Sequence, residues 1–211
     1  MYLSAPPRQP TKTSQEEPGS PGFFCDLTEL FTHGPFYSPD FLSHKTRQEV
    51  TMRVGVVSDT HNNLKNVRTI VELFNAEQVD RVIHTGDISQ AKTLDVLAGL
   101  HAPVFGVFGN NDQEREALQD AIERHGFVFQ DPPLHLNWCQ RSIVVVHDPL
   151  EFAGNLQDQE LALHGHTHRY RHEKSGSSII FNPGECAGMM TGRNSVGVVD
   201  LRTLECRVIK F

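Results

Sequence analysis

The pattern of apolar and polar positions changes at about residue 52 of the chain. From there on, short apolar runs that end in polar residues alternate with apolar positions at helical spacing. The runs 53–57, 79–83 and 104–108 predict buried strands. Leu64 to Phe74 has the spacing of an amphipathic helix, and further helices are expected over 93–100 and from Gln113 onward. Three such β-α units in succession predict a parallel sheet with right-handed crossovers.

The second half of the chain has a different rhythm, with short apolar runs and little helix between them. Six strands are expected there, at residues 134–138, 142–146, 161–163, 178–181, 195–201 and 206–211. A β-rich half that follows a β-α half predicts an α/β (α+β) fold, in which two sheets pack face to face with helices outside.

Residues 1–51 show no sustained period and hold seven of the twelve prolines, together with clusters of Gly, Ser and Thr. Such a composition buries too little apolar surface to offset the entropy of ordering, so we expect a disordered extension. Two alternatives stay open. The apolar stretch from Phe23 to Phe31 has the composition to dock on a partner, and Met52 could be the true start of translation. The folded domain is expected over residues 52–211.

Composition narrows the class of protein. Hydrophobic residues make up 38% and charged residues 21% of the chain, and no apolar run reaches the ~20 residues that span a bilayer. We find no secretory signal pattern, and the cysteines are scattered, which predicts a soluble protein of the reducing cytoplasm. The net charge of −7 disfavours tight binding to long nucleic acid. The cysteines are Cys25, Cys139, Cys186 and Cys206.

Metal-capable side chains follow the predicted strands. Each of the first three strands is followed by at least one such residue, and imidazoles recur after strands of the second half. The set consists of Asp59, His61, Asp87, Asn110, His147, His166 and His168. Singly, each of these positions is as readily explained by a turn or by the protein surface. Together they predict a metal site, because the carboxyl ends of parallel strands meet at one edge of a sheet.

The types of ligand indicate which metals the site would take. Mixed nitrogen and oxygen ligands suit Mn²⁺, Fe²⁺, Zn²⁺, Co²⁺ or Ni²⁺ better than Ca²⁺. A carboxylate between the other ligands could bridge two ions at roughly 3.5–4 Å, the separation of two-metal hydrolases.

The order of these motifs resembles that of the calcineurin-like metallophosphoesterases, and the compact size resembles their small YfcE-like phosphodiesterase branch. The motifs are Asp59-x-His61, Gly86-Asp87, Gly109-Asn110-Asn111-Asp112, His147, Gly165-His166-Thr167-His168 and Asn182-Pro183-Gly184. The resemblance extends from Met52 to the C-terminus.

The resemblance implies a four-layer αββα sandwich and a centre of two divalent ions, for which we expect Mn²⁺. It places Asp59, His61 and His168 on one ion, and Asn110, His147 and His166 on the other, with Asp87 as the bridge. The expected reaction is hydrolysis of a small phosphodiester by a metal-bridging hydroxide. Asp87 and Asn111 are the expected catalytic residues.

Two positions depart from the family pattern. Asn111 stands where many members have a histidine, or a cysteine in the YfcE-like branch, and a carboxamide does not donate a proton at neutral pH. We therefore expect diesters with good leaving groups to be preferred over monoesters. Asp148-Pro149 follows His147 where glycine is more common, which changes the expected shape of the loop and leaves the substrate open.

The other histidines and the surface have simpler interpretations. We expect His84 and His164 to support the ligands rather than bind metal, and alternation places His164 on the same side as His166. Arg169 and Arg171 could pair with phosphate or be solvated.

A non-catalytic scaffold, similar in fold to the retromer scaffold subunit, is the alternative function from another class of protein. A phosphomonoesterase is a second alternative, and self-association is left open.

Overall fold

The computed structural model describes residues 51–189 and 193–211, so the predicted extension lies outside the described residues except for Thr51. The first half contains the expected β-α units. They are β1 (Arg53–Val57), α1 (Leu64–Ala76), β2 (Arg81–His84), α2 (Ala91–Leu97), β3 (Val104–Val107) and α3 (Arg115–His125), followed by β4 (Val128–Gln130). Strands β1 to β4 pair in parallel, and β10 (Ser195–Asp200) and β11 (Glu205–Lys210) extend this sheet antiparallel beyond β1.

The second sheet is formed by the strands between β4 and β10. It comprises β5 (Leu134–Trp138), β6 (Arg141–Val145), β7 (Leu161–Leu163), β8 (Arg171–Ser175) and β9 (Ser178–Asn182). Their order is β5-β6-β7-β9-β8, with a parallel centre and an antiparallel strand at each edge. Both sheets are therefore mixed. The strands β4 and β8 were not expected, because β4 has only three residues and β8 is largely exposed and polar.

Local sequence explains the boundaries of the helices that carry the first sheet. The side chain of Asn63 accepts a hydrogen bond from the N–H of Asn66 at 3.2 Å, which caps α1. Helix α3 ends at His125 and is capped by Gly126, whose φ of 67° is the left-handed conformation typical of a helix end.

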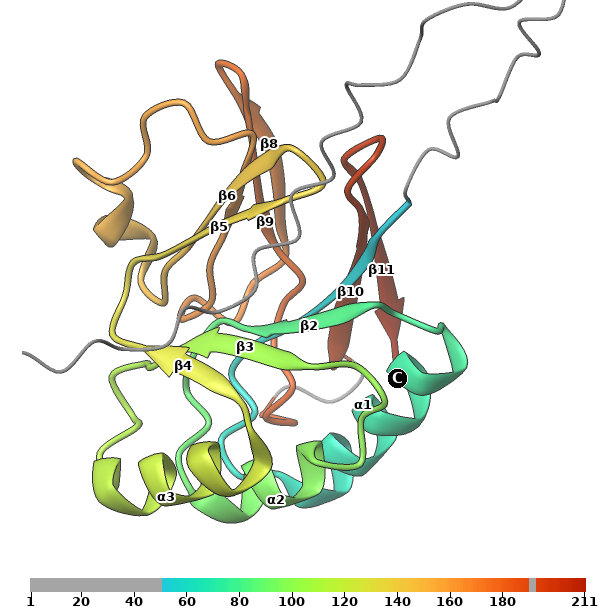
Figure 1. Cartoon of the computed structure of the whole chain (residues 1–211), viewed down its shortest axis with the longest axis vertical. Helices are drawn as coiled ribbons and strands as arrows, with labels where there is room; N and C mark the ends of the chain where they lie inside the picture. The colour runs from blue at the N-terminus through green and yellow to red at the C-terminus, as the bar shows by residue number, and fades with distance from the viewer. Residues whose placement is uncertain (1–50, 190–192) are drawn as a thin grey trace, which may run out of the picture. The chain divides into compact units, whose positions relative to one another are not determined.

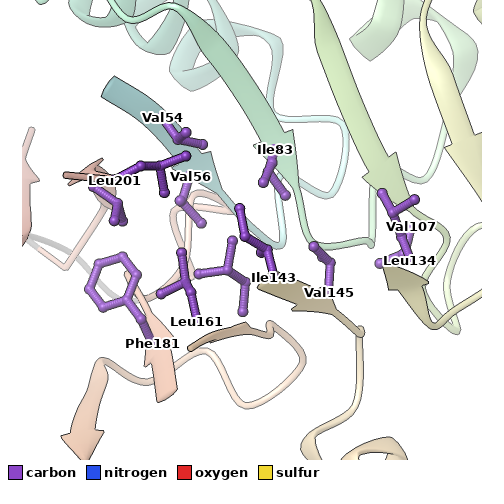
Figure 2. Packing of buried hydrophobic residues seen from close by; sticks show 12 residues of the cluster. Val54, Val56, Ile83, Val107, Leu134, Ile143, Val145, Leu161, Phe181 and Leu201 are labelled. Atoms are coloured by element: carbon purple, nitrogen blue, oxygen red, sulfur yellow. The ribbon is translucent and has the colours of Figure 1, made fainter. Parts of the chain in front are cut away.

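The main core lies between the two sheets (Figure 2). Val54 and Val56 of β1 and Ile83 of β2 pack in the same buried cluster as Ile143 and Val145 of β6. Burial of this apolar surface fixes the face-to-face packing of the sheets.

Alternate residues of the strands face outward from this core. On the first sheet, Val57 and Val82 pack with Ile70 and Phe74 of α1. Helices α1, α2 and α3 lie on the side of this sheet that faces away from the second sheet (Figure 1).

On the second sheet, Val144 and Ala162 pack with Phe152 of the 3-10 helix η1 (Pro149–Phe152). The α/β class with two packed mixed sheets is confirmed. Among the described residues, η1 is the helical part of the fourth layer. No described helix has the length and apolarity needed to cross a bilayer.

Candidate metal centre

The predicted ligands converge on the edge of the sandwich where the parallel strands of both sheets end. The first sheet contributes its ligands from the loops after β1, β2 and β3, and the second sheet from the loops after β6 and β7. All seven predicted side chains take part in one connected set of contacts at this edge.

Four of these residues form a first cluster of donor atoms. Asp59, His61, Asp87 and His168 each offer one ligand atom, and these atoms all lie within 4.8 Å of one another. His61 Nε2 lies 3.3 Å from Asp87 Oδ2 and 3.3 Å from His168 Nε2. His168 Nε2 lies 3.5 Å from Asp59 Oδ1. Two carboxylates and two imidazoles at this spacing match the donor set of a transition-metal ion.

Three further residues form a second cluster next to the first. Asn110 Oδ1 lies 2.9 Å from His147 Nε2 and 3.0 Å from His166 Nδ1. The two imidazole nitrogens are 3.2 Å apart. One carboxamide oxygen and two imidazoles therefore converge on a single point, as ligands of a second ion would.

Asp87 stands between the two clusters. Its Oδ2 faces His61, and its Oδ1 lies 3.5 Å from His147 Nε2. Burial raises the pKa of Asp87, but hydrogen bonds from His147 and Asn111 outweigh burial and hold the pKa below its ordinary value. The carboxylate is therefore ionised and presents one oxygen to each cluster.

The backbone at the centre is unusual. Asp59, His61, Asp87, His166 and His168 have φ between 41° and 66°, in the left-handed region that is costly for residues other than glycine. Conformations of this kind persist where the surrounding structure enforces them, and they cluster at functional sites.

Two of the candidate ligand histidines are oriented by neighbours that the sequence analysis did not identify. His168 Nδ1 lies 2.9 Å from Oε2 of the buried Glu185, and His147 Nδ1 lies 2.9 Å from the carbonyl oxygen of Thr85. Both acceptors hold a proton on Nδ1, which leaves Nε2 free to bind metal. Glu185 directly follows the Asn182-Pro183-Gly184 motif. Its position next to this motif is the sequence feature that could have identified Glu185.

Asp112 organises the loops around Asp87. Its carboxylate accepts hydrogen bonds from the backbone N–H groups of Asp87 at 3.0 Å, Ser89 at 2.6 Å and Gly109 at 2.7 Å. The loops after β2 and β3 are thereby tied together, which sets the approach of Asn110 to Asp87.

The departure at His147-Asp148-Pro149 has a defined structure. Asp148 caps η1, and the Glu151 side chain accepts from the N–H groups of His147 and Asp148 at 3.1 Å each, which completes a capping box. Asp148 Oδ2 also lies 3.8 Å from His166 Nε2. The loop therefore keeps His147 in place and puts a carboxylate behind His166.

The supporting histidines differ in their environments. Buried His84 accepts the Gly86 N–H at Nδ1 (3.1 Å) and contacts Thr60 Oγ1 through Nε2 (3.1 Å), and burial lowers its pKa to about 3. His164 packs against Phe152, and burial lowers its pKa to about 4. Alternation does not apply to His164, because β7 ends at Leu163 and His166 has a left-handed backbone.

Comparison with known proteins places the chain in a family. Residues 52–204 match the model of the calcineurin-like phosphoesterase superfamily domain. Phosphodiesterase MJ0936 of Methanocaldococcus jannaschii is 32% identical over 166 residues, which cover 75% of this chain and 98% of the relative.

Solved structures agree with this match. A novel archaeal phosphodiesterase superposes with a TM-score of 0.70 at 31% identity, covering 76% of this chain and 100% of that one. E. coli YfcE, a phosphoesterase, has a TM-score of 0.58 at 21% identity over 75% and 98% of the chains. Vps29 of Entamoeba histolytica, solved with Zn²⁺, shares the fold with a TM-score of 0.53 at 17% identity over 76% and 98%. The chain therefore belongs to the calcineurin-like phosphoesterase superfamily.

Proposed function

We propose that this chain hydrolyses small phosphodiesters with a centre of two divalent ions, for which Mn²⁺ is the best candidate. The observation that carries the proposal is the position of Asp87, whose two carboxylate oxygens face two separate clusters of donor atoms. Asp59, His61 and His168 would hold one ion, and Asn110, His147 and His166 the other. A carboxylate shared between two such clusters suits a pair of ions.

The donor chemistry fits ions that activate water. Bound there, two divalent ions would supply hydroxide near neutral pH and offset the negative charge of a phosphate. Since most of the ligands are neutral imidazoles or a carboxamide, the centre would keep net positive charge for an anionic substrate.

Asn111 favours diesters that have a good leaving group. Asn111 occupies the rim of the centre, and its side chain is a hydrogen-bond donor that carries no transferable proton at neutral pH. A poor leaving group would receive no proton from this position, whereas an acidic leaving group needs none. The similarity to a relative named as a phosphodiesterase supports the same substrate class.

The alternative scaffold function would not require metal ligands. A protein that only binds partners needs no competent ligands, yet this chain keeps a carboxylate, carboxamide or imidazole at all seven positions, and the structure brings them together. The free thiols of Cys139, Cys186 and Cys206 fit the proposed cytoplasmic location.

The absence of tight binding to long nucleic acid stays a prediction, and the formation of a homo-oligomer stays open.

The test is an assay of metal-depleted protein, with and without Mn²⁺, against bis(4-nitrophenyl) phosphate and 4-nitrophenyl phosphate. We expect Mn²⁺-dependent turnover of the diester and slower turnover of the monoester. Asp87→Asn should abolish this turnover, and Asp120→Asn, at an exposed acid of α3, should preserve it. Absence of metal-dependent turnover of either ester would leave the scaffold interpretation, and faster monoester turnover would refute the proposed preference for diesters.

A further inference from the structure

A cavity of about 690 Å³ opens directly beside the metal centre, and His168 belongs to both. Its walls come from the loop after β7, the turn after β9 and the strands β10 and β11. They are lined by His168, Arg169, Tyr170, Pro183, Gly184, Arg193, Ser195, Cys206, Val208 and Lys210. The volume falls in the range of roughly 300–1,000 Å³ that is typical of small-molecule sites.

The charge of this cavity is opposite to that of the whole chain. Arg169, Arg193 and Lys210 line it together with no carboxylate, although the chain has a net charge of −7. Within residues 51–189 and 193–211, none of these three cations forms an ion pair. Their charge is therefore available to a ligand and is concentrated next to the place where a phosphate would react.

The floor of the cavity is built and held in place. Ser195 Oγ donates to the carbonyl oxygen of Pro183 at 2.6 Å, which ties the turn after β9 to the start of β10. Gly184 has φ of 112°, and a Cβ there would come within 2.6 Å of Ser195 Oγ, so this position excludes other residues. Glycine at this point therefore allows the close approach of the turn to Ser195.

An aromatic ring stands at the rim. Tyr170 is 58% exposed, and its ring packs edge-on against buried Phe181 at a centroid distance of 6.4 Å. An exposed tyrosine that is braced from behind offers a flat face to a planar group, such as a nucleobase.

The geometry points to a substrate with an extended arm: a phosphodiester in which one arm is a nucleoside that carries a second phosphate. The scissile phosphate would lie at the metal centre, the nucleoside would fill the cavity beside Tyr170, and Arg193 and Lys210 would bind the second phosphate. A phosphate alone is far smaller than the cavity, and this mismatch favours an arm of nucleoside size. This inference rests on the proposed diesterase function.

The test compares two chromogenic diesters that release the same leaving group. Thymidine 5′-(4-nitrophenyl phosphate) and its 3′-phosphorylated form differ only in the second phosphate. With the Mn²⁺-loaded full chain, we expect kcat/KM for the phosphorylated form to be higher by about 10- to 100-fold, the range expected of hydrogen bonds to a charged group. In the double variant Arg193→Gln/Lys210→Met the ratio of the two kcat/KM values should fall to about one. This holds even if the variant also changes kcat/KM for the diester without the 3′-phosphate.

A matched control lies on the same strand. Arg207 is three residues from Lys210 in β11, does not line the cavity and pairs with Glu77. Arg207→Gln should keep the wild-type ratio. Equal kcat/KM values for both diesters in the wild type, or a ratio that survives in the double variant, would overturn the proposal.

A binding measurement separates this inference from the proposed function. Calorimetry should show that thymidine 3′,5′-bisphosphate binds more tightly than thymidine 5′-monophosphate, and that the double variant loses the difference. If the chain hydrolysed neither diester but still bound the bisphosphate more tightly, the proposed hydrolysis would be refuted. The cavity would still be assigned to the nucleoside and its second phosphate. Equal binding of the two nucleotides would contradict the cavity's role even in an active enzyme.

Discussion

Asn111 donates two hydrogen bonds to Asp87, one to each carboxylate oxygen. Its backbone N–H donates to Oδ1 at 2.8 Å, and its side-chain Nδ2 donates to Oδ2 at 2.8 Å. The residue that departs from the family pattern therefore holds the carboxylate proposed as the metal bridge. The sequence analysis expected a catalytic role for Asn111 and did not include this positioning contact of its side chain.

A histidine at this position should change the leaving-group dependence of the reaction. Asn111→His restores a group that titrates near neutral pH, so it should raise turnover of alkyl-leaving diesters by about 10²-fold. Turnover of 4-nitrophenyl diesters, whose leaving group needs no proton, should change much less. The measurement is kcat against leaving-group pKa for both proteins, and parallel dependences would contradict the explanation.

Glu185 should tune metal affinity through His168. Glu185→Gln weakens the acceptor that holds the proton on His168 Nδ1, and loss of such a contact lowers metal affinity by roughly 10- to 100-fold. Calorimetric titration of metal-free protein with Mn²⁺ measures the effect. Glu173→Gln, at an exposed residue of β8, serves as the control and should bind as the wild type does. An unchanged affinity in Glu185→Gln would show that this contact is dispensable.

Gly109 should be irreplaceable for a local steric reason. A Cβ at this position would overlap Asp87 Oδ1, so Gly109→Ala must displace the carboxylate proposed as the bridge and should lower Mn²⁺ affinity by at least tenfold. Gly176→Ala is the control: its φ of 61° makes alanine strained, but no atom lies within 4 Å of the added Cβ. That variant should lose roughly 1 kcal/mol of stability and keep its affinity. Wild-type affinity in a folded Gly109→Ala protein would refute the steric argument.

The buried histidines should make the metal-free protein sensitive to mild acid. Unfolded His84 takes up a proton below about pH 6.5, whereas folded His84 does so only near its pKa of about 3. His164 behaves alike, with a folded pKa of about 4. The unfolded state therefore binds more protons in this window, and stability falls as pH falls.

Urea unfolding at pH 6.5 and 5.5 measures this loss, to which each histidine should contribute about 1 kcal/mol. His147 changes the pH dependence of stability in the opposite direction. Burial lowers its pKa, but Asp87 raises it to about 9, so its stabilisation is fully present below pH 6.5 and is lost as pH rises toward 9. His84→Gln should show a smaller loss than the wild type. An identical loss would mean that His84 does not titrate as described.

The fold and the grouping of the candidate ligands at one edge were predictable because both depend on local patterns. Apolar strands that end in Asp59, Asp87 and Asn110 place these residues at one edge once the strands are parallel. The strand β8 was not predictable from the sequence, because an exposed polar strand at the edge of a sheet has no apolar periodicity. Contacts between residues far apart in sequence, such as Glu185 with His168 and Asp112 with Asp87, depend on the packing of loops, which no local pattern encodes.

The most direct test of the two-metal account is the number of Mn²⁺ ions bound per chain when diester turnover saturates. Metal-free protein is titrated with Mn²⁺, and bound metal and hydrolysis of bis(4-nitrophenyl) phosphate are measured on the same samples. The position of Asp87 between two donor clusters predicts two ions per chain at full activity. Full activity with one bound ion, or activity without metal, would contradict it.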